Sequence, residues 1–366
     1  MNFLIGSGLS SPYLKTLGNI EILLTQLAKA DLQNDAVILI RASLYKEYFD
    51  GVMANNLKVI DADPECEEVL KNYRTFINLI NSILLRRKST ILSKEANIFT
   101  TNVDVFLEKA LEDAGVEYND GFNGRFHPSF SLSNFKKSRS KRSLHYDNVA
   151  ELPVFNLLKL HGSLAWHLAE NESIGFSVSL DQVREIQAIS LPDGAVLEIG
   201  SDLPFDDIVA ACANRSADER LNSFLEVYDN LLIVNPTKEK FKYTLLNHTY
   251  YELLRMFSNE LERENTVLFV MGFSFCDEHI RELVLRAANS NPTLVIYVFA
   301  YSSHAKSEIE GRLGLDRLVN KNIELVAPEQ DEKTRDDLFK YELSTINTRI
   351  FSPILEPHEI PEIGLP

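Results

Sequence analysis

The sequence predicts an α/β protein built on a doubly wound parallel sheet, and three observations support this fold class. Short apolar runs such as Thr266–Met271 and Leu294–Ala300 are typical of strands buried on both faces. Amphipathic stretches with helical spacing alternate with these runs. Polar or glycine-containing loops follow the predicted strands. Alternating strands and helices favour a parallel sheet that is covered by helices.

The composition is that of an ordinary globular protein. The 366 residues are 45% hydrophobic and 25% charged, which allows a sizeable core. The net charge of -16 argues against a broad polyanion-binding surface. No apolar run is long enough to span a bilayer, and Met1–Ser10 lacks the basic region and cleavage site of a signal peptide. We therefore expect a cytoplasmic protein with no membrane segment.

The three cysteines give no sign of a metal site. Cys66, Cys212 and Cys276 are far apart and form no CxxC pair. A structural zinc site needs closely spaced pairs of ligands, so we expect no zinc and no other metal.

The first predicted strand, Phe3–Ile5, runs into Gly6-Ser7-Gly8-Leu9-Ser10. Two glycines after a strand allow backbone amides to approach a phosphate. A helix expected from Leu14 onward would add its N-terminal amides. This loop is a candidate phosphate site.

A long helical segment follows. From Tyr13 to about Leu92, apolar residues recur at helical spacing, and Val37–Ile40, which alone is compatible with a short strand, has helical flanks. A simple crossover needs far fewer residues, so we interpret about residues 13–95 as an inserted helical subdomain.

The second strand, Asn97–Thr101, leads into Thr101-Asn102-Val103-Asp104 and then an amphipathic helix, Phe106–Ala114. Asn102 and Asp104 therefore lie at the carboxyl end of a strand, where ligands bind in open α/β sheets. Asp104 has a structural alternative, because Asp before a helix commonly caps it.

Residues 118–147 show no sustained period and predict a mobile surface loop. It holds the most basic run of the chain, Lys136–Arg142. Such a run is either a solvated surface or a weak nucleic-acid contact.

The stretch Asn156–Trp166 predicts a buried strand that ends at His161-Gly162-Ser163. A histidine there is either a satisfied turn residue or a base. About residues 165–225 are less regular and predict a second insertion or lid, and Leu231–Val234 predicts a further strand.

The last third of the chain predicts regular alternation. A helix, Tyr250–Glu264, precedes the strand Thr266–Met271, which ends at Gly272–Asp277. Asp277 is the expected N-cap of a helix over Glu278–Asn289. The strand Leu294–Ala300, a short helix near Ser307–Leu313 and a last strand, Ile323–Val326, complete the sheet. Residues 331–366 are expected to form an extended tail, since proline recurs from Pro353 onward.

Four loops together resemble the NAD-binding domain of the sirtuin (SIR2) family. In order they are G-S-G-L-S at 6–10, T-N-V-D at 101–104, K-L-H-G-S at 159–163 and G-F-S-x-x-D at 272–277. The chain is most similar to SIR2-like proteins of bacterial anti-phage defence that degrade NAD. The resemblance implies a Rossmann-like, sirtuin-like sheet over residues 1–330.

The resemblance also implies roles for individual residues. The dinucleotide phosphates and adjoining ribose would be held by Gly6, Ser7, Gly8 and Ser10. Thr101 would also contact NAD. Asn102 and Asp104 would hold the nicotinamide ribose and position a water, and His161 would be the base. Gly272, Ser274 and Asp277 would line the adenosine side.

The departures from the family pattern favour water as the acceptor. The zinc module of the deacylases is absent, and Ser11-Pro12-Tyr13 replaces their usual Gly-Ile-Pro pattern. Asn235-Pro236-Thr237 stands where a peptide-docking motif would follow a strand. We therefore expect an NAD+ hydrolase (NADase) that yields nicotinamide and ADP-ribose. A protein deacylase, an ADP-ribosyltransferase and a non-catalytic NAD or ADP-ribose sensor are the alternatives.

Partners follow from the same resemblance. An enzyme that depletes NAD must be restrained, and the chain has little length left for a sensor or motor. We expect a homo-oligomer that works with a HerA-type ATPase, or second with an Argonaute-like protein.

Overall fold

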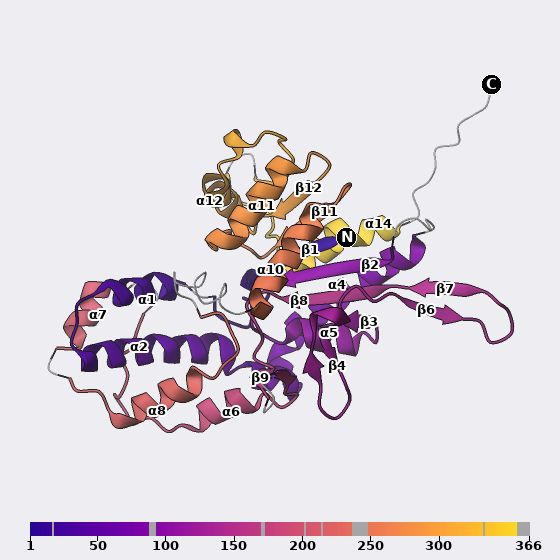
Figure 1. The fold of residues 1–366 in the computed structure, drawn as a ribbon. Helices are drawn as coiled ribbons and strands as arrows, with labels where there is room; N and C mark the ends of the chain where they lie inside the picture. Colours follow the sequence, from indigo (N-terminus) through magenta and orange to yellow (C-terminus); the bar gives the residue numbers. More distant parts are fainter. Residues whose placement is uncertain are drawn as a thin grey trace.

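The core of the protein is a sheet of seven parallel strands (Figure 1). The computed structural model describes residues 1–16, 18–87, 93–169, 173–200, 203–213, 215–235, 248–331 and 334–356. The strands lie in the order β13 (Ile323–Val326), β12 (Val295–Phe299), β11 (Val267–Met271), β1 (Asn2–Ile5), β2 (Glu95–Thr100), β8 (Val154–Lys159) and β3 (Glu117–Asn119). β2, β8 and β3 lie on one side of β1, and the later strands β11, β12 and β13 lie on its other side. The order thus reverses between β1 and β11, which confirms a doubly wound, Rossmann-like sheet.

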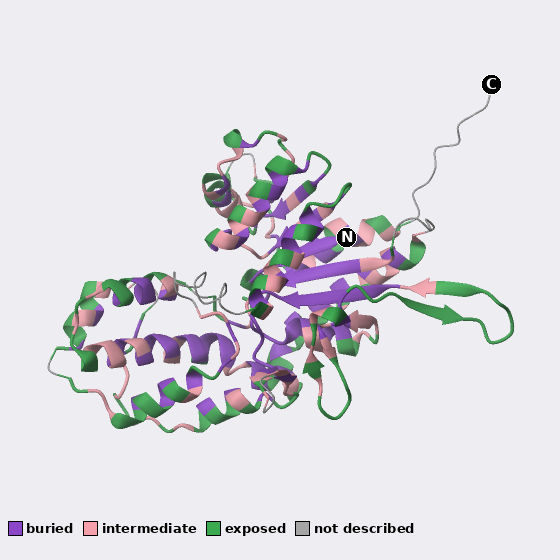
Figure 2. Ribbon diagram, viewed as in Figure 1, coloured by how far each residue is buried: buried purple, intermediate pink, exposed green. Residues whose placement is uncertain are grey.

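Both faces of the sheet are buried, which explains the unbroken apolar runs (Figure 2). Phe3 and Ile5 join a core with helices α4 (Glu67–Arg86) and α5 (Phe106–Asp113). Leu4 points to the opposite face and a second core. That core includes α10 (His248–Leu261), α11 (Glu278–Ser290) and α12 (Ser303–Leu313). The period of two along β1 therefore divides the interior into two layers.

A row of four asparagines crosses the sheet. Asn97 donates to Asn2 at 2.8 Å, Asn156 donates to Asn97 at 2.8 Å, and Asn119 donates to Asn156 at 3.0 Å. The same residues are paired in the strand register, and all four are buried. Each amide satisfies its neighbour, so the row favours this register over a slipped one.

The helices between β1 and β2 are α1 (Ile20–Lys29), α2 (Asn34–Tyr48), α3 (Asn56–Ile60) and α4. Val37–Ile40 lies inside α2 and is helical. The helix expected from Leu14 begins only at Ile20. Residues Ser7–Leu9 form a 3-10 helix instead. A further turn follows, in which Leu14 N donates a hydrogen bond to Ser10 O at 2.8 Å.

Helices from two distant segments form a lobe beside the sheet (Figure 1). Against α2 lie α7 (Phe205–Ala211) and α8 (Glu219–Tyr228), and α6 (Asp181–Ala188) packs on α8. The rings of Tyr45 and Tyr228 stack with centroids 4.3 Å apart. Residues 165–225 are thus more regular than their sequence predicted.

Small β elements replace the loop predicted over residues 118–147. A four-stranded sheet contains β4 (Phe122–Asn123), β5 (Ser129–Phe130), β10 (Ile174–Phe176) and β9 (Trp166–Leu168). A separate hairpin joins β6 (Arg139–Arg142) and β7 (Val149–Leu152). The basic run is therefore partly a strand.

Two other predictions are wrong. Leu231–Val234 forms no strand, and only Ile233 bridges to Gly162. The expected extended tail instead forms helical turns at Leu343–Ile346 (α13), Asn347–Phe351 and Ser352–Leu355 (α14). Phe351 is fully buried in the core that contains α4. Pro353 lies in the first turn of α14, where a missing amide proton costs nothing.

Within the described residues, no helix combines the length and apolar character needed to cross a membrane. Residues 357–366 and 236–247 lie outside the described part, so the end of the predicted tail and most of the segment after Asn235 are not described.

Candidate functional site

The four predicted loops leave the same edge of the sheet at the same level. Ile5 pairs with Thr100 and with Met271, and Thr100 pairs with Lys159. The strands are parallel, so the residues that follow these four positions emerge side by side. They do so at the carboxyl ends around the β1–β11 reversal, where ligands bind in this class of sheet.

Contacts between the loops bring them together. Gly8 N donates to Gly272 O at 3.0 Å, and Leu164 N donates to Val103 O at 3.0 Å. His161 Nε2 lies 3.1 Å from Asp277 Oδ2.

The first and last loops touch through their glycines. A Cβ atom on Gly6 would lie 2.4 Å from Gly272 O, and Gly272 has a φ of +62°. Only glycine permits both the close approach and the left-handed backbone without strain. The amides of Gly6 and Gly8 donate to Met271 O and Gly272 O, each at 3.0 Å. In this arrangement the glycines join the two loops, and phosphate binding by their amides stays a prediction.

Asn102 is buried at 4% exposure, and no hydrogen bond of ordinary geometry reaches its amide nitrogen or oxygen. Its backbone is fixed, because Asn102 N donates to Thr100 Oγ1 at 3.0 Å and Thr100 Oγ1 donates to Ile5 O at 2.9 Å. Thr101, beside it, is half-buried and donates its amide to Ile5 O at 3.4 Å. The hydroxyl of buried Tyr73 is the side chain that interacts with this amide. A buried amide with no hydrogen bond of ordinary geometry costs about 1–3 kcal/mol, which a ligand at the strand end would offset.

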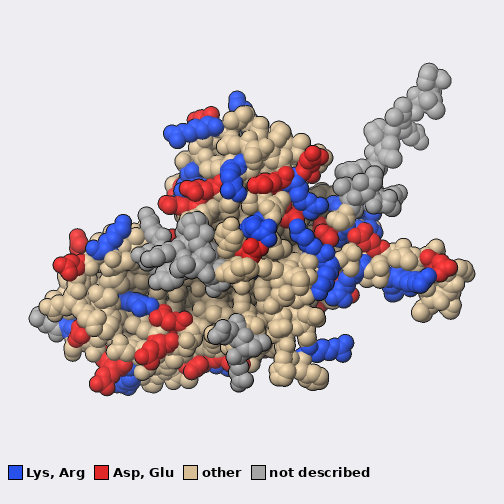
Figure 3. Space-filling view, viewed as in Figure 1, with Lys and Arg blue, Asp and Glu red and all other residues tan. Residues whose placement is uncertain are grey.

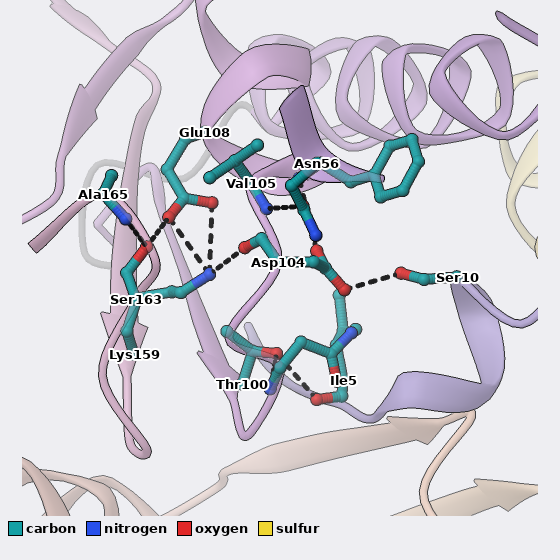
Figure 4. Close-up of polar contacts among 12 residues, drawn as sticks. Ile5, Ser10, Asn56, Thr100, Asp104, Val105, Glu108, Lys159, Ser163 and Ala165 are labelled. Carbon is teal, nitrogen blue, oxygen red and sulfur yellow. Dashed lines mark hydrogen bonds and ion pairs between the residues drawn. The ribbon is translucent and has the colours of Figure 1, made fainter. Parts of the chain in front are cut away.

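Asp104 is buried and joins two loops (Figure 4). Its carboxylate accepts from Ser10 Oγ at 2.9 Å and from Phe106 N, at the start of α5, at 3.2 Å. Ser10 Oγ also lies 2.9 Å from the hydroxyl of buried Tyr73. Burial raises the pKa of Asp104, and Lys159 opposes that shift. The N-cap residue of α5 is Val105, one residue after Asp104, so Asp104 binds the first amide of the helix from outside the cap position. Asp104 and Ser10 together join the loops after β2 and β1.

A buried ion pair supports the same loops and was missed by sequence reasoning. Lys159 Nζ lies 3.0 Å from Glu108 Oε1, and Ser163 Oγ donates to that oxygen at 2.9 Å (Figure 4). Lys159 also donates to the carbonyl of Asp104. The only sequence signal was a lysine inside an apolar strand, since a buried charge requires a partner.

Asn56 was missed as well. Its side chain accepts from Val105 N at 3.0 Å and donates to Val52 O at 2.7 Å. It therefore fixes the loop after β2 to the helical segment, a contact with no local sequence signal.

His161 and Asp277 form a pair above the strand ends. The His161 side chain is 15% exposed, and Asp277 Oδ1 accepts from His279 N and Ile280 N of α11. The predicted N-cap is therefore confirmed. The same carboxylate faces the histidine, where it can orient the ring. The resemblance had placed Asp277 on the adenosine side, whereas here it lies against His161.

A cavity of about 470 Å³ adjoins the β1–β11 reversal. Of the predicted residues, Gly8, Gly272 and Ser274 line it. Other lining residues are Phe273, Phe299, Tyr301, Tyr341, Glu308 and Arg312. Its size and its aromatic and charged walls are those of a small-molecule site. Asn102, Asp104, His161 and Asp277 are not among the residues that line this cavity.

No cluster of three or more His, Cys, Asp or Glu side chains is placed to hold a metal within the described ranges. Comparison of the chain with protein-family models and with curated proteins finds no match.

Proposed function

We propose that the protein is an NAD+ glycohydrolase that cleaves the nicotinamide–ribose bond and releases nicotinamide and ADP-ribose. The observation that carries this proposal is the buried amide of Asn102, which makes no hydrogen bond of ordinary geometry and leaves the same strand-end edge as the His161–Asp277 pair. An amide that can orient a ribose hydroxyl or water, together with an oriented histidine, suits hydrolysis of a glycosidic bond.

The chemistry requires little of the protein. Nicotinamide in NAD+ is cationic and leaves as a neutral molecule, so no strong acid is needed. Cleavage passes through an oxocarbenium-like state, as in other glycoside cleavages. Asn102 would orient the ribose or the attacking water, and His161 would accept the proton as a general base. Asp277 would hold the imidazole ring in one orientation, and the cavity beside Gly8 and Gly272 would take the adenosine side.

Finer features of the proposal rest on the resemblance of the four loops. They are a sirtuin-like domain with an inserted helical subdomain, a role in anti-phage defence by NAD depletion, and a HerA-type or Argonaute-like partner. The lobe of α1, α2, α6, α7 and α8 would be the inserted subdomain, built from both inserted segments.

The proposal is tested by incubating the purified chain with NAD+ and separating the products by chromatography. We expect equal amounts of nicotinamide and ADP-ribose without any acyl-lysine peptide or acceptor protein. Turnover that requires an acyl-lysine peptide would instead identify a deacylase. Stabilisation of about 2.7 kcal/mol at a hundredfold excess of NAD+ over its Kd, with no product, would identify a sensor.

A further inference from the structure

Tyr73 reaches the candidate site from outside the four loops. It lies in α4, within the helical segment between β1 and β2, and its side chain is fully buried. Its ring stacks on that of Phe106, the first residue of α5, with centroids 5.6 Å apart and planes 13° apart. The stacked ring fixes the position of the hydroxyl, which contacts the loops that follow β1 and β2.

The Tyr73 hydroxyl belongs to a chain of hydrogen bonds. Its oxygen lies 2.9 Å from Ser10 Oγ, and Ser10 Oγ donates to Asp104 Oδ2 at 2.9 Å (Figure 4). The other carboxylate oxygen of Asp104 accepts from Phe106 N at 3.2 Å. A carboxylate only accepts hydrogen bonds, so the single hydroxyl proton of Ser10 is directed to Asp104. The Tyr73 hydroxyl must then donate its own proton to Ser10 Oγ.

This direction determines what the Tyr73 oxygen can do for Asn102. The amide of Asn102 also interacts with the Tyr73 hydroxyl. A hydroxyl whose proton is already donated can only accept a second hydrogen bond, so Asn102 Nδ2 is the atom that faces Tyr73. Asn102 Oδ1 is then left for a ligand group that donates a hydrogen bond, such as a ribose hydroxyl or a water.

The surroundings favour a neutral contact of this kind. Charged side chains are spread over the face of the molecule that Figure 3 shows, whereas Tyr73 and Asn102 are buried. A hydroxyl can hold an amide in the interior without the cost of burying a further charge. Burial raises the pKa of Tyr73, so the hydroxyl keeps the proton that it donates to Ser10.

We propose that Tyr73 is the positioning residue for Asn102: its hydroxyl donates to Ser10, accepts from the Asn102 amide and turns the amide carbonyl oxygen toward the ligand. The helical segment thus supplies a part of the site that none of the four loops contains. The inference rests on the proposed function, since Asn102 orients the ribose hydroxyl or the water of that reaction. The contact between the two side chains does not itself depend on the reaction.

Steady-state turnover of NAD+ by Tyr73→Phe tests the positioning, because this change removes the hydroxyl and keeps the ring. We expect kcat to fall at least about tenfold while KM changes less than about threefold, as for an interaction that matters in the transition state. The matched control is Tyr228→Phe in the lobe, which removes another buried hydroxyl that has no hydrogen-bond partner among the described residues. The control should turn over NAD+ like the parent.

A double-mutant cycle separates positioning from a general loss of stability. Because Tyr73 acts through Asn102, Tyr73→Phe should change kcat less than about twofold when Asn102 is already alanine. The proposal is overturned if Tyr73→Phe leaves kcat unchanged, or if it lowers kcat equally in the parent and in Asn102→Ala.

Urea unfolding of the same four proteins without NAD+ tests the contact alone. The effects of Tyr73→Phe and Asn102→Ala should be non-additive by at least about threefold in the unfolding equilibrium constant. A parent that does not turn over NAD+ would defeat the proposed function but not the contact, which the unfolding cycle then decides. Additive effects in that cycle would show that the two side chains do not interact, and the proposal would fail.

Discussion

Asn102 and Asn97 show how the same residue type serves two purposes. Both side chains are buried, but Asn97 has two amide partners in neighbouring strands and Asn102 has none of ordinary geometry. A fold gains nothing from an unsatisfied buried amide. The free-energy cost of the unsatisfied Asn102 amide, at the strand end, is therefore best explained by a ligand that binds there.

Asp104 predicts a pH dependence of stability. Burial holds its pKa above the ordinary 3.8. A carboxyl group with a higher pKa in the folded state binds more protons there than in the unfolded state, so its contribution to stability falls as pH rises through that window. Asp104→Asn should therefore gain stability relative to the parent as pH rises above 3.8, by about 1.4 kcal/mol for each unit of pKa shift.

Urea unfolding measures the effect over a pH range that also extends below 3.8, where the lowered pKa of the control residue lies, and Asp181→Asn is that control. Hydrogen bonds from Ser179 and Ser177 lower the pKa of Asp181, so its contribution to stability is lost as pH falls and the sign is reversed. The account of Asp104 is wrong if both variants show the same trend.

At the scale of elements, the register of the sheet depends on the asparagine row. Asn97→Ala leaves the Asn2 side-chain oxygen without its donor and the Asn156 amide without its acceptor. Each unsatisfied group costs about 1–3 kcal/mol, so unfolding by urea should show a loss of roughly 2–5 kcal/mol. The exposed Asn123→Ala should change stability by less than about 0.5 kcal/mol. A loss no larger than that of Asn123→Ala would show that the row does not stabilise the sheet.

The contact between the loops after β1 and β11 is equally specific. In Gly6→Ala, the added methyl group would meet the carbonyl oxygen of Gly272 at 2.4 Å, and backbone cannot yield as a flexible side chain can. We expect a loss of about 1–3 kcal/mol, as for other overpacked sites. Gly311→Ala in α12, where nothing lies within 4 Å, should instead gain about 0.5–1 kcal/mol. Thermal unfolding of both variants tests whether Gly6 is required at this contact, and equal shifts in Tm would contradict that requirement.

For the whole molecule, local patterns predicted the elements of the sheet but not their long-range partners. The strand expected at Thr266–Met271 forms over Val267–Met271, where Leu268 and Val270 lie in one core and Met271 in the other, so burial on both faces leaves an apolar run of strand length. Leu231–Val234 is also an apolar run but forms no strand. A buried connecting segment can have the same apolar sequence as a buried strand, so the sequence does not distinguish the two.

The packing of α2 on α8 joins residues far apart in the chain, which periodicity does not report. In the candidate site, too, local features were predicted and long-range contacts were not. Chain order and strand ends predicted the four loops, and the N-cap of Asp277 followed from its place before a helix. The pairing of Asp277 with His161, and of Glu108 with Lys159, links side chains distant in sequence. Such pairs leave no local pattern, so only the structure reveals them.

The most direct test of the proposed function measures NAD+ binding and NAD+ turnover on the same preparations of parent, Asn102→Ala, His161→Ala and the exposed control His127→Ala. We predict that the first two variants stay folded, still bind NAD+, and lose at least about a hundredfold in kcat, as for removal of other positioned catalytic groups. The control should match the parent. Hydrolysis by both variants at the parental rate would contradict the account, because the strand-end asparagine and histidine would then have no part in the reaction.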